Sequence, residues 1–264
     1  MRQLPVFVLL GSSLFACARN SGTNVDSAES AVDSSDSVES EGNLMMASVD
    51  GADMSGLTAL TGDQVAAHIA ANAPARFTPA GCATATASGS NVTLTLNDCT
   101  GPRGLVHVTG ELDLTASVSL TGAISVHGAA TNLMVNRATL DVDSDAIYAV
   151  NGTTHTLDVQ TQGSGVGPLG NDVEHTGQYT ITWDTGSQCH SIAGHWSTEL
   201  SSGTASATRS NDVNLMRCAG GCPTGTVTHH FLGGASLTIT FDGTATAQWS
   251  TSGGKSGTVN LSCQ

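Results

Sequence analysis

A strictly alternating stretch, residues 106–126, most constrains how this chain can fold. Apolar or small residues fill the even positions from Val106 to Val126, and nearly all odd positions are polar. Because successive side chains of a β-strand face opposite sides, the pattern predicts strands with one buried and one solvated face. One straight strand of this length would extend about 70 Å, so the stretch must be divided. The apolar residues keep their even positions on both sides of Gly110 and Gly122. This constant parity predicts bends, or loops with an odd number of residues, at the two glycines.

A hairpin is predicted at Asn151-Gly152. Before this dipeptide the apolar positions are even, as at Tyr148, and after it they are odd, as at Leu157. A two-residue turn exchanges the parity of the inward positions, and Asn-Gly favours such a turn. We therefore expect a tight hairpin with Val150 and Thr153 flanking the turn.

Residues 61–74 carry the helical signals. Thr61 and Gln64 have the spacing of a capping box, apolar residues recur every four positions from Val65 to Ala73, and Pro74 closes the segment. We expect a helix of about three turns that covers an edge or end of a sheet.

The amino-acid composition favours an all-β protein. β-Branched residues and glycine are frequent, and aromatic residues make up only 4%. We expect an antiparallel sandwich or a curved open barrel with one short N-terminal helix. A division into two β sub-units, 75–165 and 175–264, is an alternative organisation of the same domain. A flexible break is expected at Thr161–Pro168. Further strands are expected at Gln178–Asp184, His190–Leu200, Asp212–Cys218, Gly225–Phe231, Ala235–Asp242, Thr244–Ser250 and Gly257–Cys263.

The N-terminus has the layout of a secretory signal. Arg2 precedes an apolar run, and Leu14-Phe15-Ala16-Cys17 follows. Leu14 to Cys17 resembles the lipobox of bacterial lipoproteins. The resemblance implies that residues 1–16 are removed and that acylated Cys17 anchors the protein in the bacterial cell envelope, at the outer membrane. Residues 17–56, rich in serine and acids, are expected to be a disordered tether to a β domain at 57–264.

Six further cysteines predict a disulfide framework, because an exported protein with an even number of cysteines commonly pairs them. We expect Cys82 to pair with Cys99, which a short hairpin-like segment separates. By analogy we favour Cys189–Cys218 and Cys222–Cys263, although those four allow three connectivities. The spacing of Cys218 and Cys222 could suit zinc, but no second ligand pair follows it.

The charge of the chain excludes one class of partner. The sequence has 22 acidic against 8 basic residues, a net charge of −14. Nucleic-acid binding needs clustered Lys or Arg, so we expect none. The expected membrane partner is reached through the lipid anchor, and a protein or carbohydrate surface is the remaining candidate ligand. No cofactor is expected.

The candidate metal ligands are Asp141, Asp143 and Asp145, which alternate along one strand. An EF-hand loop would need Gly at position 146 and Glu at position 152, where this chain has Ala146 and Gly152. Alternatively, water solvates these acids on the polar face of the strand and no ion is bound.

The sequence assigns no catalytic residue. The histidines have no shared spacing, and no Gly-x-Ser-x-Gly elbow is present. Rows of Thr and Ser, together with Trp183, Trp196 and Trp249, could contact a sugar or protein surface, although tryptophans of β-proteins more often lie in the core. We therefore expect a non-enzymatic binding or structural module, with an extracytoplasmic hydrolase assembled from distant residues as the alternative.

A Cys17→Ser variant tests the anchor. It should leave the membrane fraction and appear in the soluble fraction on cell fractionation, because its side chain cannot receive the acyl group. Retention on membranes at the level of the parent protein would contradict the prediction that Cys17 is acylated.

Overall fold

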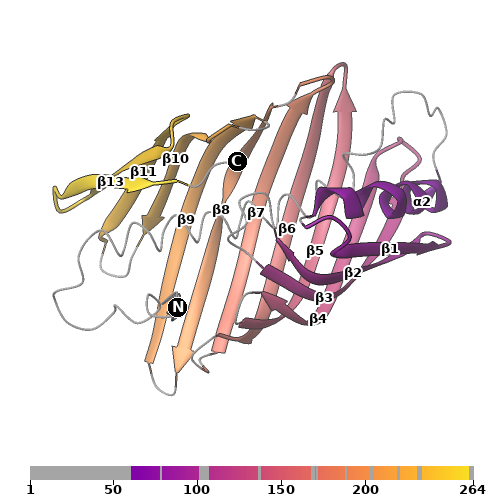
Figure 1. Ribbon diagram of the computed structural model, residues 1–264, viewed down its shortest axis with the longest axis horizontal. Coiled ribbons are helices and arrows are strands. Elements are labelled where there is room, and N and C mark those ends of the chain that lie inside the picture. The colour runs from indigo at the N-terminus through magenta and orange to yellow at the C-terminus, as the bar shows by residue number, and fades with distance from the viewer. Residues whose placement is uncertain are drawn as a thin grey trace, which may run out of the picture.

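The described part of the chain forms one antiparallel sheet. The computed structural model describes residues 61–77, 79–100, 107–135, 138–167, 170, 172–187, 189–202, 205–218, 221–230 and 234–261. In these ranges thirteen strands follow one another in sequence order, each hydrogen-bonded to its neighbours (Figure 1). They are β1 (Ala83–Ser88), β2 (Asn91–Thr100), β3 (His107–Val118), β4 (Ile124–Val135), β5 (Ala138–Asn151), β6 (Thr154–Val166), β7 (Asp172–Asp184), β8 (Cys189–Ser202), β9 (Ala205–Cys218), β10 (Thr224–His230), β11 (Ser236–Asp242), β12 (Thr246–Thr251) and β13 (Ser256–Asn260).

The predicted all-β class with one short helix is confirmed. The described strands form one open sheet, with β1 and β13 at its two edges, and not the two packed sheets of a sandwich. None of the helices in the described ranges has the length and apolar character needed to cross a membrane. The signal, Cys17 and the tether lie outside the described residues.

Helix α2 (Gly62–Asn72) begins where the capping box predicts. The Gln64 side chain accepts a hydrogen bond from the Thr61 backbone N–H at 3.0 Å, and the Thr61 hydroxyl accepts one from the Gln64 N–H. Val65 and Ile69 are buried, and the helix lies against β1, β2 and β3 (Figure 1). A 3-10 helix, η3 (Ala73–Arg76), with Pro74 in its first turn, follows. The helix therefore covers one end of the sheet, as expected.

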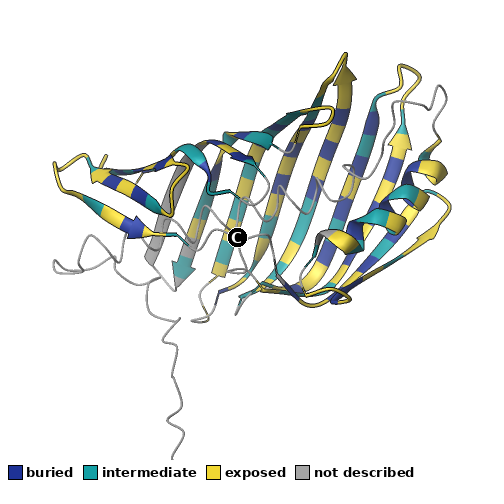
Figure 2. Ribbon diagram, turned by 45° about the horizontal axis from the view of Figure 1, so that its top comes forward, coloured by how far each residue is buried: buried dark blue, intermediate teal, exposed yellow. Residues whose placement is uncertain are grey.

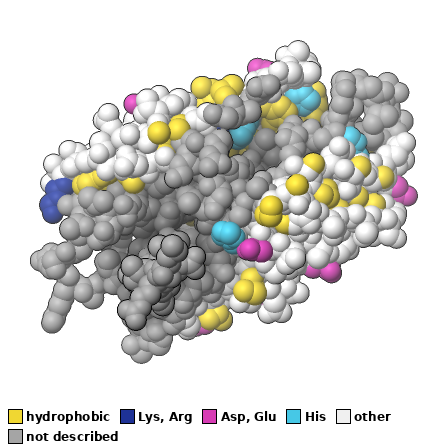
Figure 3. All heavy atoms as spheres, viewed as in Figure 1, with side chains coloured by type: hydrophobic (Ala, Val, Ile, Leu, Met, Phe, Trp, Pro, Cys, Tyr) yellow, Lys and Arg dark blue, Asp and Glu magenta, His cyan; other side chains and the backbone are white. Residues whose placement is uncertain are grey.

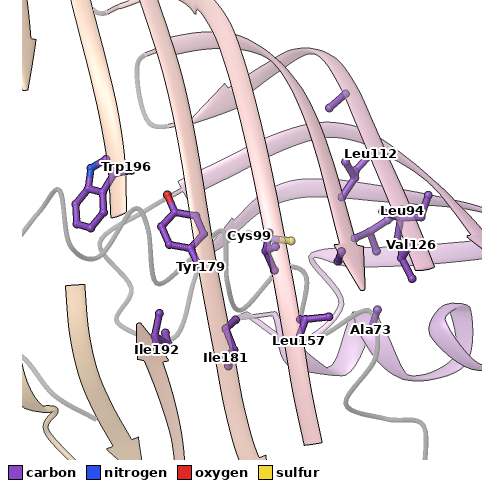
Figure 4. Packing of buried hydrophobic residues seen from close by; sticks show 14 of the residues in the cluster. Ala73, Leu94, Cys99, Leu112, Val126, Leu157, Tyr179, Ile181, Ile192 and Trp196 are labelled. Atoms are coloured by element: carbon purple, nitrogen blue, oxygen red, sulfur yellow. The ribbon is translucent and has the colours of Figure 1, made fainter. Parts of the chain in front are cut away.

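The core lies on one face of the sheet. Buried and exposed residues alternate along the strands (Figure 2), and the buried apolar side chains form a single cluster. Leu157, Ile181 and Ile192 occupy one row across β6, β7 and β8, where they pair in register (Figure 4). The period of two thus assigns most apolar side chains to the core and most polar ones to the outer face, with exceptions such as buried His229 and exposed Ile147.

Both glycines of the alternating stretch mark the interruptions predicted there. Gly110 has φ +143° and lies at a register shift between β3 and β4. Gly122 has φ +84° in the connection 119–123, whose five residues preserve parity between Val118 and Ile124. Each φ is one that glycine adopts without steric cost.

The hairpin at residue 152 is present, but its turn lies one residue later than predicted. Asn151 pairs with Thr154, so Gly152 and Thr153 form the turn, and the expected Val150–Thr153 pair is wrong. Gly152 has φ +64°, and a positive φ at the first central position alone is typical of a type II′ turn. Both registers exchange the inward parity, so parity alone could not distinguish them.

The predicted flexible break at Thr161–Pro168 is wrong over most of its length. β6 continues to Val166 and pairs with β5 and β7 through Gly163 and Gly165. A Cβ atom on Gly165 would lie 2.9 Å from the Cα of Leu140. These glycines permit close approach of the neighbouring backbone, which is the other role of glycine inside a strand. The sheet therefore runs without a gap from β6 to β7, and the division into two sub-units stays a prediction.

The predicted C-terminal strands and two of the three predicted disulfides are present. The seven predicted segments fall on β7–β13, with shifted ends. Cys82–Cys99 and Cys189–Cys218 are bonded, with Cα–Cα distances of 5.3 Å and 3.8 Å. The expected Cys222–Cys263 bridge stays a prediction, because Cys263 lies outside the described residues.

Gly257 provides a test of the packing. Its Cβ would lie 2.6 Å from the indole ring of Trp249, which is 5% exposed and cannot move aside freely. Gly257→Ala should therefore lower the free energy of unfolding by about 1–3 kcal/mol, the usual cost of overpacking. Gly253→Ala, in the same hairpin but with no neighbour closer than 3.8 Å, is the control. Urea denaturation of the two variants measures the difference, and equal stabilities would contradict the packing.

Candidate functional site

A row of polar side chains crosses the outer face of the sheet in its central part, from β4 to β8. The register aligns His127 of β4 with Asp145 of β5, Gln160 of β6, Gln178 of β7 and His195 of β8. All five residues are exposed. The residues come from separate strands, so only the pairing of the strands brings them into one row.

A shallow groove of about 400 Å³ lies along this row. Its lining includes Asp143, Asp145, Gln160, Gln162, Gln178 and His195, from β5 to β8. No Lys, Arg, Phe, Tyr or Trp is among the lining residues. The groove is therefore hydrogen-bonding and acidic, on a molecule whose visible described side chains are mainly uncharged (Figure 3).

Three side chains converge at one end of the groove. His127 Nδ1 lies 3.0 Å from Asp145 Oδ1, and His127 Nε2 lies 3.7 Å from Asp143 Oδ2. The side chains are 47%, 69% and 45% exposed for His127, Asp145 and Asp143. One ligand atom from each residue lies within 4.8 Å of the others. We call these three residues the His-Asp-Asp cluster.

Asp141 has a different position. Its Oδ1 accepts a hydrogen bond of 2.7 Å from the backbone N–H of Asn132, which has φ +55°. Asn132 lies where the register between β4 and β5 shifts, between Ala130 and Leu133. Of the three carboxylates singled out in the sequence, Asp143 and Asp145 come together, whereas Asp141 stabilises this bulge.

His127 was not identified from the sequence. Its odd position in the alternating stretch places it on the polar face, but the facing residue depends on the β4–β5 register. The bulge at Asn132 makes that register impossible to count from the loop alone. The parity of position 127 was the available signal. It identifies the face of the sheet on which His127 lies, but not the residue that faces it on β5.

The tryptophans do not line the groove. Trp196 and Trp249 are buried in the core, and Trp183 is half-buried on the core face, where it stacks on His155 at a centroid distance of 5.2 Å. Thr156, Thr180 and Thr182 alternate with core residues and lie on the opposite face, whereas Ser144 and Thr161 are buried on the core face. The expected combination of Thr/Ser rows with tryptophans therefore does not form one surface.

A second group of polar side chains lies at the β5–β6 end of the core face. The Tyr148 hydroxyl is hydrogen-bonded to His155 Nδ1, and His155 Nε2 lies 2.7 Å from the Thr185 hydroxyl. His195, in contrast, lines the outer groove, and His229 packs edge-on against Trp196. His155, His195 and His229 therefore occupy three separate environments.

Comparisons with protein-family models, with curated proteins and with solved structures gave no match.

The different roles of the aspartates can be tested by stability. Asp141→Ala removes the acceptor of the Asn132 N–H and should lower the free energy of unfolding by up to about 1 kcal/mol. Asp143→Ala should stay within about 0.5 kcal/mol of the parent, as surface substitutions usually do. Thermal denaturation by circular dichroism measures both. A larger loss for Asp143→Ala than for Asp141→Ala would contradict the assignment.

Proposed function

We propose that this protein is a lipid-anchored binding module of the bacterial cell envelope that holds a neutral, hydroxyl-rich ligand, such as an oligosaccharide, in the groove across β5–β8. The observation that carries the proposal is the convergence of three glutamines with Asp and His side chains in one groove. Small-molecule sites are typically concave and fix their ligand through a few polar groups.

The chemistry of the lining selects the ligand class. Each of Gln160, Gln162 and Gln178 offers an amide that both donates and accepts hydrogen bonds, as sugar hydroxyl groups do. Asp143 and Asp145 repel anionic ligands and accept from hydroxyl groups. The lining therefore favours neutral polyols over nucleotides, phosphates or fatty acids.

The location rests on two supports. Cys82–Cys99 and Cys189–Cys218 are typical of an oxidising compartment outside the cytoplasm. The lipobox resemblance at Leu14–Cys17 supplies the anchor and the bacterial envelope.

Titration calorimetry of the full chain in detergent micelles tests the ligand. A panel of neutral oligosaccharides and matched uronic-acid oligosaccharides serves as the probe. We expect binding of a neutral member, weakened at least tenfold in a Gln160→Ala/Gln178→Ala variant and unchanged in Gln248→Ala, an exposed glutamine of β12. Binding of the acidic members alone, or equal binding by both variants, would contradict the proposal.

The alternative function is an extracytoplasmic hydrolase, and the series Thr185–His155–Tyr148 favours it. A hydroxyl in reach of a histidine that a third group orients is the arrangement of an activated nucleophile. Here a phenol replaces the carboxylate that stabilises the imidazolium in the best-known triads. Turnover of p-nitrophenyl acetate that Thr185→Val and His155→Gln both abolish would support it. Equal rates for parent and variants would exclude this site.

A further inference from the structure

We propose that the His-Asp-Asp cluster of His127, Asp143 and Asp145 binds a divalent transition-metal ion of the zinc class. The donor set decides the metal. One imidazole nitrogen with two carboxylate oxygens suits zinc and its neighbours, whereas calcium prefers six to eight oxygen ligands.

The spacing of the donors fits a shared ion. Ligand atoms bound at about 2.0–2.2 Å to one metal lie at most about 4.4 Å apart. The 3.0 Å contact to Asp145 uses His127 Nδ1 and the 3.7 Å contact to Asp143 uses Nε2, and one ion takes only one of these nitrogens. With a single donor atom from each residue, the three donors lie within 4.8 Å of one another, close to that limit. A small rotation of these side chains, which are 45–69% exposed, brings the widest separation below the limit.

A neighbouring residue orients one of the ligands. The Gln162 side-chain amide donates a hydrogen bond of 3.5 Å to Asp143 Oδ1, and this leaves Asp143 Oδ2 directed at His127. Groups outside the ligand shell that fix a carboxylate in this way are a regular part of metal sites. The groove beside the cluster leaves open coordination positions for water or for a ligand donor.

The described chain contains a natural comparison. His107 Nδ1 lies 2.8 Å from Asp98 Oδ1, in an exposed pair outside the His-Asp-Asp cluster. Substitution of His107 therefore removes an exposed imidazole beside a carboxylate on the same sheet without touching the cluster, and it provides a matched control.

The experiment is titration of ZnCl₂ into the full chain, in detergent micelles and freed of metal by chelation, followed by calorimetry. The parent should bind one ion that His127→Gln and Asp145→Asn each weaken at least tenfold, whereas His107→Gln should bind as the parent does. The ligand side chains are exposed, and circular dichroism verifies that the variants remain folded.

Absence of zinc binding by the parent, or an equal affinity in His127→Gln, Asp145→Asn and His107→Gln, would overturn the proposal. The inference does not depend on the saccharide: the Gln160→Ala/Gln178→Ala variant should bind the sugar at least tenfold more weakly and bind zinc as the parent does. Failure of either proposal is therefore recognised separately.

Discussion

Burial of one apolar face of a single sheet is the interaction on which the rest of this structure depends. The hydrophobic residues recur every second position, so pairing the strands in sequence order gathers them on one side, where they form one cluster. Helix α2 adds cover at one end only. The side chains that alternate with these buried residues therefore lie on the outer face. The polar row of β4–β8 is a consequence of that arrangement.

The site follows from register more than from motif. His127, Asp145, Gln160 and Gln178 are separated along the chain by whole strands, yet adjacent strands place them next to one another. A slip of one residue between β4 and β5 would move one member to the core face. Asp141, which satisfies the N–H of Asn132 at the bulge, helps to fix that register and so belongs to the framework of the site.

Much of the fold could be predicted from local signals. Thr61 and Gln64 located the helix, alternation located the strands, and a short separation identified Cys82–Cys99. The errors arose where the same local signal has two structural meanings. Glycines 163 and 165 read as a flexible break, but they permit the backbones of β5 and β6 to approach. The cluster could be predicted only in part, because Asp143 and Asp145 share a strand, whereas His127 comes from the far side of a bulge.

The most direct measurement is the register between β4 and β5 in solution, by cross-strand nuclear Overhauser effects on isotopically labelled protein. Backbone contacts between His127 and Asp145, and between Val126 and Ala146, are predicted from the pairing. Contacts of His127 with Ser144 or Ala146 as its directly facing residue would place the histidine opposite a core position. That result would contradict both the polar row and the cluster built on it.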